Sequence, residues 1–274
     1  MIKNFIDKLL AKASPGARKA AQSPFGKREE VPAAVHGIDP HRVDPRAVDV
    51  VRTLQQAGFE AYIVGGAVRD LLLGLKPKDF DVATNATPEE VKRLFRRAFI
   101  IGKRFRIVHV VHGRGQEHEV IEVSTFRAQV DNVAAEQVAG NEKTSRSDLA
   151  GMTHAVGASG RVLRDNVWGP QDQDATRRDF TLNAMYYDPE TQIVVDYHKG
   201  IQDAQKKTLR MIGDPIQRYR EDPVRIIRAV RFAAKLTSPG FKLALKTAKP
   251  LVAPTALLAE APPSRLCAGL PHHR

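Results

Sequence analysis

A glycine turn followed closely by two carboxylates is the feature that most constrains this chain. The apolar run at residues 61–64 ends at Gly65 and Gly66, and helix-forming residues from 68 to 73 follow. The two glycines are therefore predicted to lie at a strand-to-helix turn, which points free backbone N–H groups and a helix dipole toward an anion. Arg69, in the first turn of that helix, is expected to add a forked contact to a triphosphate. A purely structural turn is the plain alternative.

The carboxylates lie on an alternating segment, Asp79-Phe80-Asp81-Val82. Alternate residues of a strand share a face, so Asp79 and Asp81 are predicted to point the same way about 7 Å apart, while Phe80 and Val82 point to the core. Two such carboxylates repel each other unless a cation lies between them. Mg²⁺ takes oxygen ligands and commonly binds through one or two carboxylates plus substrate phosphates. Asp79 and Asp81 are therefore the predicted metal ligands, and a solvated turn is the alternative.

A third acidic candidate lies further along the chain. Strands are predicted over residues 100–112 and 119–126, paired around a turn at residues 113–115. Glu122 lies in the middle of the second strand, where a buried carboxylate needs a partner or a metal. An exposed position on an edge strand is the equal alternative for Glu122.

Together these residues carry a family resemblance. The signature of the class II nucleotidyltransferases, which comprise bacterial poly(A) polymerases and tRNA CCA-adding enzymes, resembles Gly65-Gly66-x-Val68-Arg69-Asp70-x-Leu72-Leu73-Gly74 with Asp79-x-Asp81. Two further motifs follow in the family's order, Arg177-Arg178-Asp179-Phe180-Thr181-Leu182-Asn183-Ala184 and Glu221-Asp222-Pro223-Val224-Arg225-Ile226-Ile227-Arg228-Ala229-Val230-Arg231-Phe232. The resemblance covers residues 40 to 266.

The first of these two motifs is expected near a helix start, with Asp174 as the cap. The resemblance implies that Arg178 contacts the incoming nucleotide and that Asp179 is one of the active-site carboxylates. An ordinary ion pair within the motif is the alternative from the residues alone. Between Asp179 and Glu122, Asp179 is the expected third acid, because the family motif surrounds it.

The other motif is predicted to form one helix over residues 221–235. At about 100° per residue, Asp222, Arg225 and Arg228 fall within one arc, opposite an apolar arc. The resemblance implies that Asp222 and Arg225 read the nucleotide base in place of a template strand. It also implies that Arg228 and Arg231 support the nucleotide or its phosphates. A solvated face with i,i+3 ion pairs is the plain alternative.

The predicted fold class is α/β (α+β), with a nucleotidyltransferase head whose small mixed sheet is flanked by helices, followed by a short all-helical neck. Residues 1–46 are expected to be a basic mobile arm, 47–196 the head and 197–266 the neck that reads the base. Residues 267–274 are an atypical tail, because the resemblance would continue into an amphipathic helix. A frameshifted or prematurely ended reading frame is the hypothesis for this tail.

Composition favours a polyanionic partner. The 274-residue chain has a formal net charge of +12, which suits RNA better than a membrane surface. One cysteine, Cys267, excludes an internal disulfide and a multi-cysteine zinc site, as a reducing cytoplasm would allow. No stretch approaches the length of a transmembrane helix, and no secretory signal is evident. A cytoplasmic protein with no membrane span is therefore expected.

The expected activity is Mg²⁺-dependent addition of AMP from ATP to RNA 3′ ends, with release of pyrophosphate. The alternatives are a tRNA CCA-adding transferase and a truncated, inactive RNA-binding module. Residues 129–162 lack a sustained apolar period, and order is expected to return at residues 163–169. In the family, a similar segment precedes the Arg-Arg-Asp motif particularly in poly(A) polymerases, which favours poly(A) addition.

Overall fold

The computed structural model describes residues 24–102, 105–114, 117–128, 136–138, 154–157, 162–236, 238 and 240–252. The tail at 267–274, Cys267, the first half of the predicted arm and most of the segment 129–162 lie outside these residues. Within the described part of the chain, no helix is both long and apolar enough to cross a membrane.

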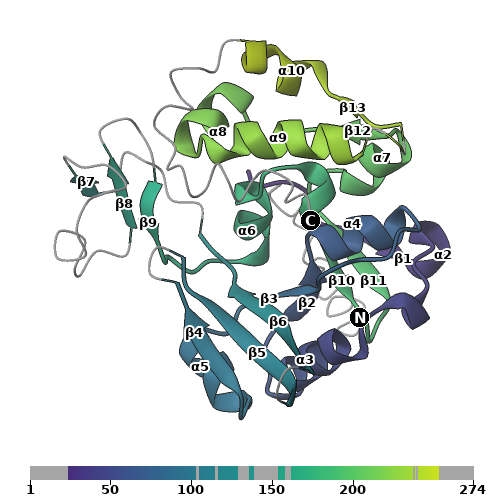
Figure 1. Ribbon diagram of the computed structural model, residues 1–274, viewed down its shortest axis with the longest axis vertical. Coiled ribbons are helices and arrows are strands. Elements are labelled where there is room, and N and C mark those ends of the chain that lie inside the picture. The colour runs from purple at the N-terminus through teal and green to yellow at the C-terminus, as the bar shows by residue number, and fades with distance from the viewer. Residues whose placement is uncertain are drawn as a thin grey trace, which may run out of the picture.

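An eight-stranded mixed sheet forms the centre of the molecule, in the order β1-β11-β10-β2-β3-β6-β5-β4 (Figure 1). All neighbouring strands are antiparallel except β3 and β6, which run parallel. The strands are β1 (Glu29–Pro32), β2 (Ala61–Val64), β3 (Asp81–Thr84), β4 (Ala98–Ile101), β5 (Ile107–Arg114), β6 (Glu117–Thr125), β10 (Met185–Asp188) and β11 (Ile193–Asp196). A separate small sheet holds β7 (Glu136–Val138), β8 (His154–Gly157) and β9 (Val162–Asp165).

Two amphipathic helices cover one face of the large sheet. The first, α3 (Pro45–Gln56), begins at Asp44, whose side chain accepts from a free backbone N–H, and α5 (Pro88–Leu94) begins with a capping box at Thr87. Both helices contact the sheet and each other. The core beneath them is built from alternate strand residues, among them Val82, Val108, Val123 and Ile63.

The opposite face of the sheet is covered only in part. Here α6 (Gln171–Arg177) packs over the middle strands, where Ala175 joins Val64, Ala83 and Tyr186 in a second cluster. Two short helices adjoin the sheet, α2 (Ala33–His36) and α4 (Gly66–Leu72).

The C-terminal elements form their own core. These are α7 (Gly200–Gln205), β12 (Thr208–Leu209), α8 (Pro215–Glu221), α9 (Val224–Lys235), β13 (Lys242–Leu243) and α10 (Leu245–Ala248). Leu209, Tyr219, Ile226 and Leu236 pack together there with Phe180. Figure 1 shows α8 and α9 lying across the top, with α6 between them and the sheet. Short 3₁₀ turns occur at Pro40–Arg42, Thr181–Asn183 and Lys249–Val252.

The α/β class and the mixed sheet are as predicted, but several elements differ. The predicted mobile arm is wrong from Glu29 onward, because β1 pairs with β11 and buries its neighbours. The predicted strand 100–112 is two antiparallel strands, β4 and β5. The pairing of β5 with β6 is as predicted, but Gly113 and Arg114 belong to β5 and not to a turn, and the rest of the predicted turn lies outside the described residues. The predicted helix 221–235 breaks between α8 and α9, because Pro223 disfavours a helical conformation at Asp222. The neck is also not purely helical, since β12 and β13 pair in it.

Candidate active site

The glycine turn lies directly against one of the predicted carboxylates. Gly65 connects β2 to α4 with φ 72° and ψ −132°, a conformation that favours glycine. A Cβ atom at Gly65 would lie 3.8 Å from Oδ2 of Asp81 and 4.0 Å from Nη1 of Arg178. The strand-to-helix turn is therefore confirmed, and it brings the glycine loop, a carboxylate and an arginine into one place.

The acidic pair is arranged differently from the prediction. Asp81 is the first residue of β3, whereas Asp79 is exposed and lies just before the strand. The intervening Phe80 and the following Val82 are buried in the core, as predicted. Asp79 still raises the pKa of Asp81 through its charge, so the two carboxylates are close enough to interact.

Glu122 stands beside Asp81. The two residues are register partners on the parallel strands β3 and β6. Burial and the charge of Glu122 raise the pKa of Asp81 to about 6, against the opposing effect of Arg178. Nε2 of His109, on β5, lies 3.4 Å from Oε1 of Glu122. Burial is the larger cause, so the ionised form of Asp81 is disfavoured unless a cation offsets both the burial and the neighbouring carboxylate.

These carboxylates fit a hard divalent cation that is completed by substrate. Among the described residues, no three acidic, histidine or cysteine side chains form a ready-made metal cage. The donors that do lie here are carboxylate oxygens, which Mg²⁺ prefers, and it commonly takes water and phosphate oxygens for its other ligands. The excess negative charge at Asp81 is the physical observation that supports such a cation.

Asp179 is held in an ion pair. Its carboxylate accepts from Arg228 at 2.6 Å, from Nδ2 of Asn183 at 3.1 Å and from the backbone N–H of Phe180 at 2.7 Å. Burial alone would raise the pKa of Asp179, but Arg228 and these hydrogen bonds hold it below its usual value. The register places Glu122 beside Asp81, and the expected role of Asp179 as the third acid stays a prediction.

Arg69 is buried beside the glycine turn, where a Cβ atom at Gly66 would lie 3.4 Å from its Nη2. It is only 3% exposed, and its Nη2 lies 2.7 Å from Oδ1 of Asp70. Its Nη1 donates to Oδ1 of Asn183 at 2.8 Å, and its guanidinium lies over the ring of Phe232. The guanidinium is buried and already bonded, and its expected contact with a triphosphate stays a prediction.

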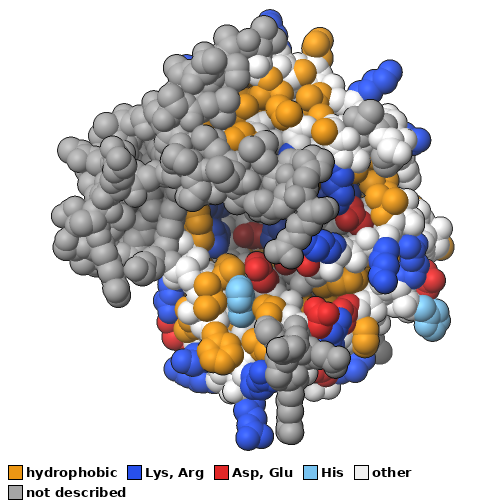
Figure 2. All heavy atoms as spheres, in the orientation of Figure 1, with side chains coloured by type: hydrophobic (Ala, Val, Ile, Leu, Met, Phe, Trp, Pro, Cys, Tyr) orange, Lys and Arg blue, Asp and Glu red, His pale blue; other side chains and the backbone are white. Residues whose placement is uncertain are grey.

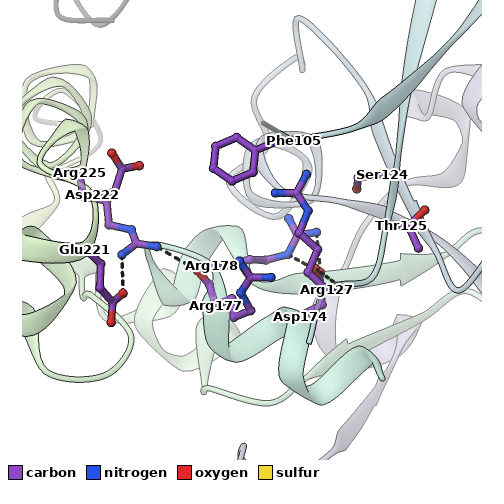
Figure 3. A pocket seen from close by; sticks show the side chains of 10 residues that line it. All are labelled: Phe105, Ser124, Thr125, Arg127, Asp174, Arg177, Arg178, Glu221, Asp222 and Arg225. Carbon is purple, nitrogen blue, oxygen red and sulfur yellow. Dashed lines mark hydrogen bonds and ion pairs between the residues drawn. The ribbon is translucent and has the colours of Figure 1, made fainter. Parts of the chain in front are cut away.

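A cavity of about 310 Å³ opens where the sheet meets α6, α8 and α9 (Figure 3). The residues lining it are Phe105, Ser124, Thr125, Arg127, Asp174, Arg177, Arg178, Glu221, Asp222 and Arg225. Figure 3 shows Asp222, Arg225 and Glu221 at one end, Arg177 and Arg178 in the middle, and Arg127 and Asp174 beyond them.

Positive charge is crowded around this cavity. Burial together with the charges of Arg127, Arg218 and Arg225 lowers the pKa of Arg177 to about 9. Burial and Arg225 lower the pKa of Arg218 to about 10, and burial lowers that of Arg127. Burial removes hydration from a guanidinium and neighbouring cations repel it, and both effects lower its pKa. The cavity is therefore suited to a multiply charged anion.

Asp174 organises the middle of the cavity. It was expected to cap a helix, but it lies inside α6, and the Arg-Arg-Asp motif ends that helix. Its Oδ2 accepts from Nη2 of Arg178 at 3.0 Å and from the Tyr186 hydroxyl at 2.7 Å. Its Oδ1 accepts from the backbone N–H of Arg127 at 3.1 Å. The fully buried Tyr186 ring also lies under the guanidinium of Arg178.

The two predicted base-reading residues lie at the α8–α9 junction. Asp222 follows the last residue of α8, and Arg225 is in the first turn of α9. Nη1 of Arg225 donates to Oε2 of Glu221 and to the backbone carbonyl of Arg218, both at 3.0 Å. These bonds fix the guanidinium at the cavity edge.

The two remaining predicted residues, Arg228 and Arg231, lie in different environments. Arg228 is bound to Asp179 and lies over the Phe232 ring, so it supports the site from outside the cavity lining. Arg231 is exposed and does not line the cavity, and its role stays a prediction. The sequence reasoning missed Arg127, Phe105 and the buried hydroxyl of Tyr186, because no local pattern marks them.

The comparisons with known proteins agree with this geometry. The family model described as poly A polymerase head domain matches residues 61–210, which include the glycine turn, the carboxylates and the Arg-Arg-Asp motif. This chain belongs to that family, which is a nucleotidyltransferase family.

The relatives include poly(A) polymerases and CCA-adding enzymes. Poly(A) polymerase I of Salmonella typhi is 44% identical over 97% of this chain and 52% of its own length. The CCA-adding enzyme of Lactobacillus helveticus is 38% identical over 70% of this chain and 41% of its own. The CCA-adding enzyme of Bacillus stearothermophilus in complex with CTP superposes with a TM-score of 0.62 at 32% identity, covering 82% of this chain and 47% of that structure. The chain thus spans about half the length of the poly(A) polymerases it matches.

Proposed function

We propose that this chain transfers AMP from ATP to the 3′ end of RNA and releases pyrophosphate. The observation that carries the proposal is the contact between two oppositely charged regions. A cavity crowded with arginines, suited to a triphosphate, adjoins Asp81, whose carboxylate is buried and repelled by Glu122 and Asp79. Phosphoryl transfer needs both, because an anionic substrate must be held beside carboxylates that bind a cation.

Asp79 and Asp81 would hold Mg²⁺, with Glu122 as the third carboxylate in place of Asp179. Bound Mg²⁺ would lower the pKa of the attacking hydroxyl and neutralise charge on the phosphates. In the transfer, a bond forms between the RNA O3′ and the α-phosphorus, and the α-phosphorus bond to pyrophosphate breaks. Arg177 and Arg178 stabilise the charge on the phosphates from fixed positions.

Base choice would be made at the α8–α9 junction. Asp222 offers acceptor oxygens and Arg225 offers donors whose positions are fixed by Glu221. A rigid set of donors and acceptors discriminates against the wrong base, because buried polar groups would then lose their partners. Greater identity to the poly(A) polymerases than to the CCA-adding enzymes supports ATP as the substrate. Similarity to bacterial poly(A) polymerases also supports a cytoplasmic location for this protein.

The competing function is CCA addition, favoured by the superposition on a structure bound to CTP. The test supplies each labelled NTP with Mg²⁺ to two acceptors, an unrelated short RNA and a tRNA lacking its 3′ end. Poly(A) addition predicts a ladder of A residues on the short RNA, with CTP a poor substrate. Use of CTP first, with termination after three residues on the tRNA, would establish CCA addition instead. RNA binding without incorporation at any Mg²⁺ concentration would leave only a binding module.

A further inference from the structure

A row of side chains leads from the candidate catalytic carboxylates to the edge of the sheet. Asp81 on β3 is the register partner of Glu122 on β6. Glu122 is in turn opposite His109 on β5, and His109 is opposite Phe99 on the edge strand β4. Directly opposed residues on neighbouring strands project from the same face of a sheet. With strands about 4.8 Å apart, the row spans roughly 14 Å.

This face is open at its β4 end. On the opposite face, Ile100, Val108 and Val123 pack into the core under α3 and α5. On the face of the row, α6 covers the middle strands only, and Phe99 is 53% exposed while Ile101 is 43% exposed. Large apolar side chains exposed side by side on one strand are unusual for a surface that meets water alone.

Positive charge accompanies these apolar side chains. Arg97, Phe99 and Ile101 alternate along the edge, so they share the open face. The guanidinium of Arg97 donates to the backbone carbonyl of Gly113 on β5, which places it across the open side of the strand pair. Arg96, which follows the end of α5, is also exposed. Figure 2 shows hydrophobic, histidine, basic and acidic side chains side by side in the lower half of this view.

We propose that Arg97, Phe99, Ile101 and His109, here called the edge strip, bind the RNA nucleotides directly 5′ of the reactive hydroxyl. The inference rests on the proposed function, since that function places the hydroxyl at Asp81. Phe99 stacks on a base, and Arg97 lies near the phosphates. Base stacking on an aromatic ring combined with basic residues is the chemistry that holds single strands without reading sequence. An enzyme that extends unrelated RNA ends needs such a site.

RNA fits the edge strip better than a protein partner does. The strip is continuous with the carboxylates through His109 and Glu122, so a strand bound on it runs to the site of reaction. The cation at Arg97 matches a phosphate group. A protein that covered Phe99 would instead block the approach to Asp81.

The test compares Phe99→Ala with Phe99→Trp and with Val35→Ala. Val35 is 59% exposed on α2, near the other edge of the sheet, so it is a matched control for loss of an exposed apolar side chain. Steady-state transfer is measured against RNA concentration at saturating ATP, and against ATP at saturating RNA. Binding of a fluorescent single-stranded RNA without ATP is measured by anisotropy, and thermal melting checks that each variant is folded.

Phe99→Ala should raise the KM for RNA and its Kd between about 5-fold and 150-fold, the equivalent of losing one stacked base. The KM for ATP should change less than twofold, Phe99→Trp should bind as the parent does, and Val35→Ala should have no effect. Unchanged RNA binding in Phe99→Ala, or an equal rise in the KM for ATP, would overturn the proposal. If the chain transfers no nucleotide, the anisotropy comparison still decides whether the edge strip binds RNA. RNA binding that does not depend on Phe99 would favour a protein partner for the strip.

Discussion

Asp81 and Glu122 occupy partner positions on the only parallel strand pair of the large sheet among the described residues, so their carboxylates share one face. Burial and this neighbour raise the pKa of Asp81 to about 6. The repulsion makes the pair a place where a cation is favoured, and it makes the charge of Asp81 sensitive to pH near neutrality.

The rate of transfer should therefore fall as pH drops through about 6, because protonated Asp81 no longer binds a cation. Glu122→Gln removes a repulsive charge and should shift the midpoint of the profile to lower pH. The pH dependence of kcat/KM for both proteins checks this. A midpoint that does not move would show that Glu122 has no influence on Asp81.

Asp81→Asn should remove nearly all transfer and leave the fold intact. The folded-state pKa lies above the unfolded value, so ionisation of Asp81 costs the native state stability as pH rises through about 6. The Asn variant should lose this pH dependence and be at least as stable at pH 7.5. Mg²⁺ should raise the Tm of the parent but not of Asp81→Asn or Asp79→Asn. An equal Mg²⁺ effect on all three proteins would contradict the metal assignment.

Arg69→Met should act on stability and not on nucleotide affinity. The guanidinium is buried between Asp70 and Asn183, and its removal leaves the buried Asp70 carboxylate with Lys235, 3.6 Å away, as its remaining cation, at a cost of up to about 3–5 kcal/mol. Denaturant unfolding and the KM for ATP measure the two effects separately. A stable variant with a much higher KM for ATP would restore Arg69 as a triphosphate ligand.

Tyr186→Phe tests how the cavity is organised. Loss of the hydroxyl removes the hydrogen bond that it donates to Asp174 and the one that it accepts from Nε of Arg178, but keeps the ring under Arg178. The kcat/KM for ATP should fall by a factor equivalent to about 1–2 kcal/mol, because Arg178 is then held less firmly. RNA affinity measured without ATP should be unchanged. If both affinities fall together, the hydroxyl supports the fold in general and not the nucleotide site.

Base preference should depend on the α8–α9 junction. Arg225→Ala and Asp222→Asn should each reduce the ratio of kcat/KM for ATP to that for CTP, because each removes a fixed polar partner. Arg231→Ala, at an exposed position outside the cavity, is the control and should keep the parent ratio. Unchanged selectivity in both cavity variants would move base recognition to another part of the site.

Local sequence patterns determined the elements that hold the site. The glycine turn at Gly65, the alternation of Phe80 and Val82 and the capping box at Thr87 are set by neighbours in the chain. Such features depend on backbone conformation and period, which a sequence carries directly.

Only the tertiary structure decided which side chains meet. Pairing of β3 with β6 put Glu122 beside Asp81, while packing of α9 against the head gave Asp179 its partner Arg228. Arg69 has the position of a phosphate ligand in the sequence, and the fold bonds its guanidinium to Asp70 and Asn183. These outcomes depend on contacts between residues far apart in the chain, where burial and the nearest opposite charge, and not residue type, determine what each ionisable group does.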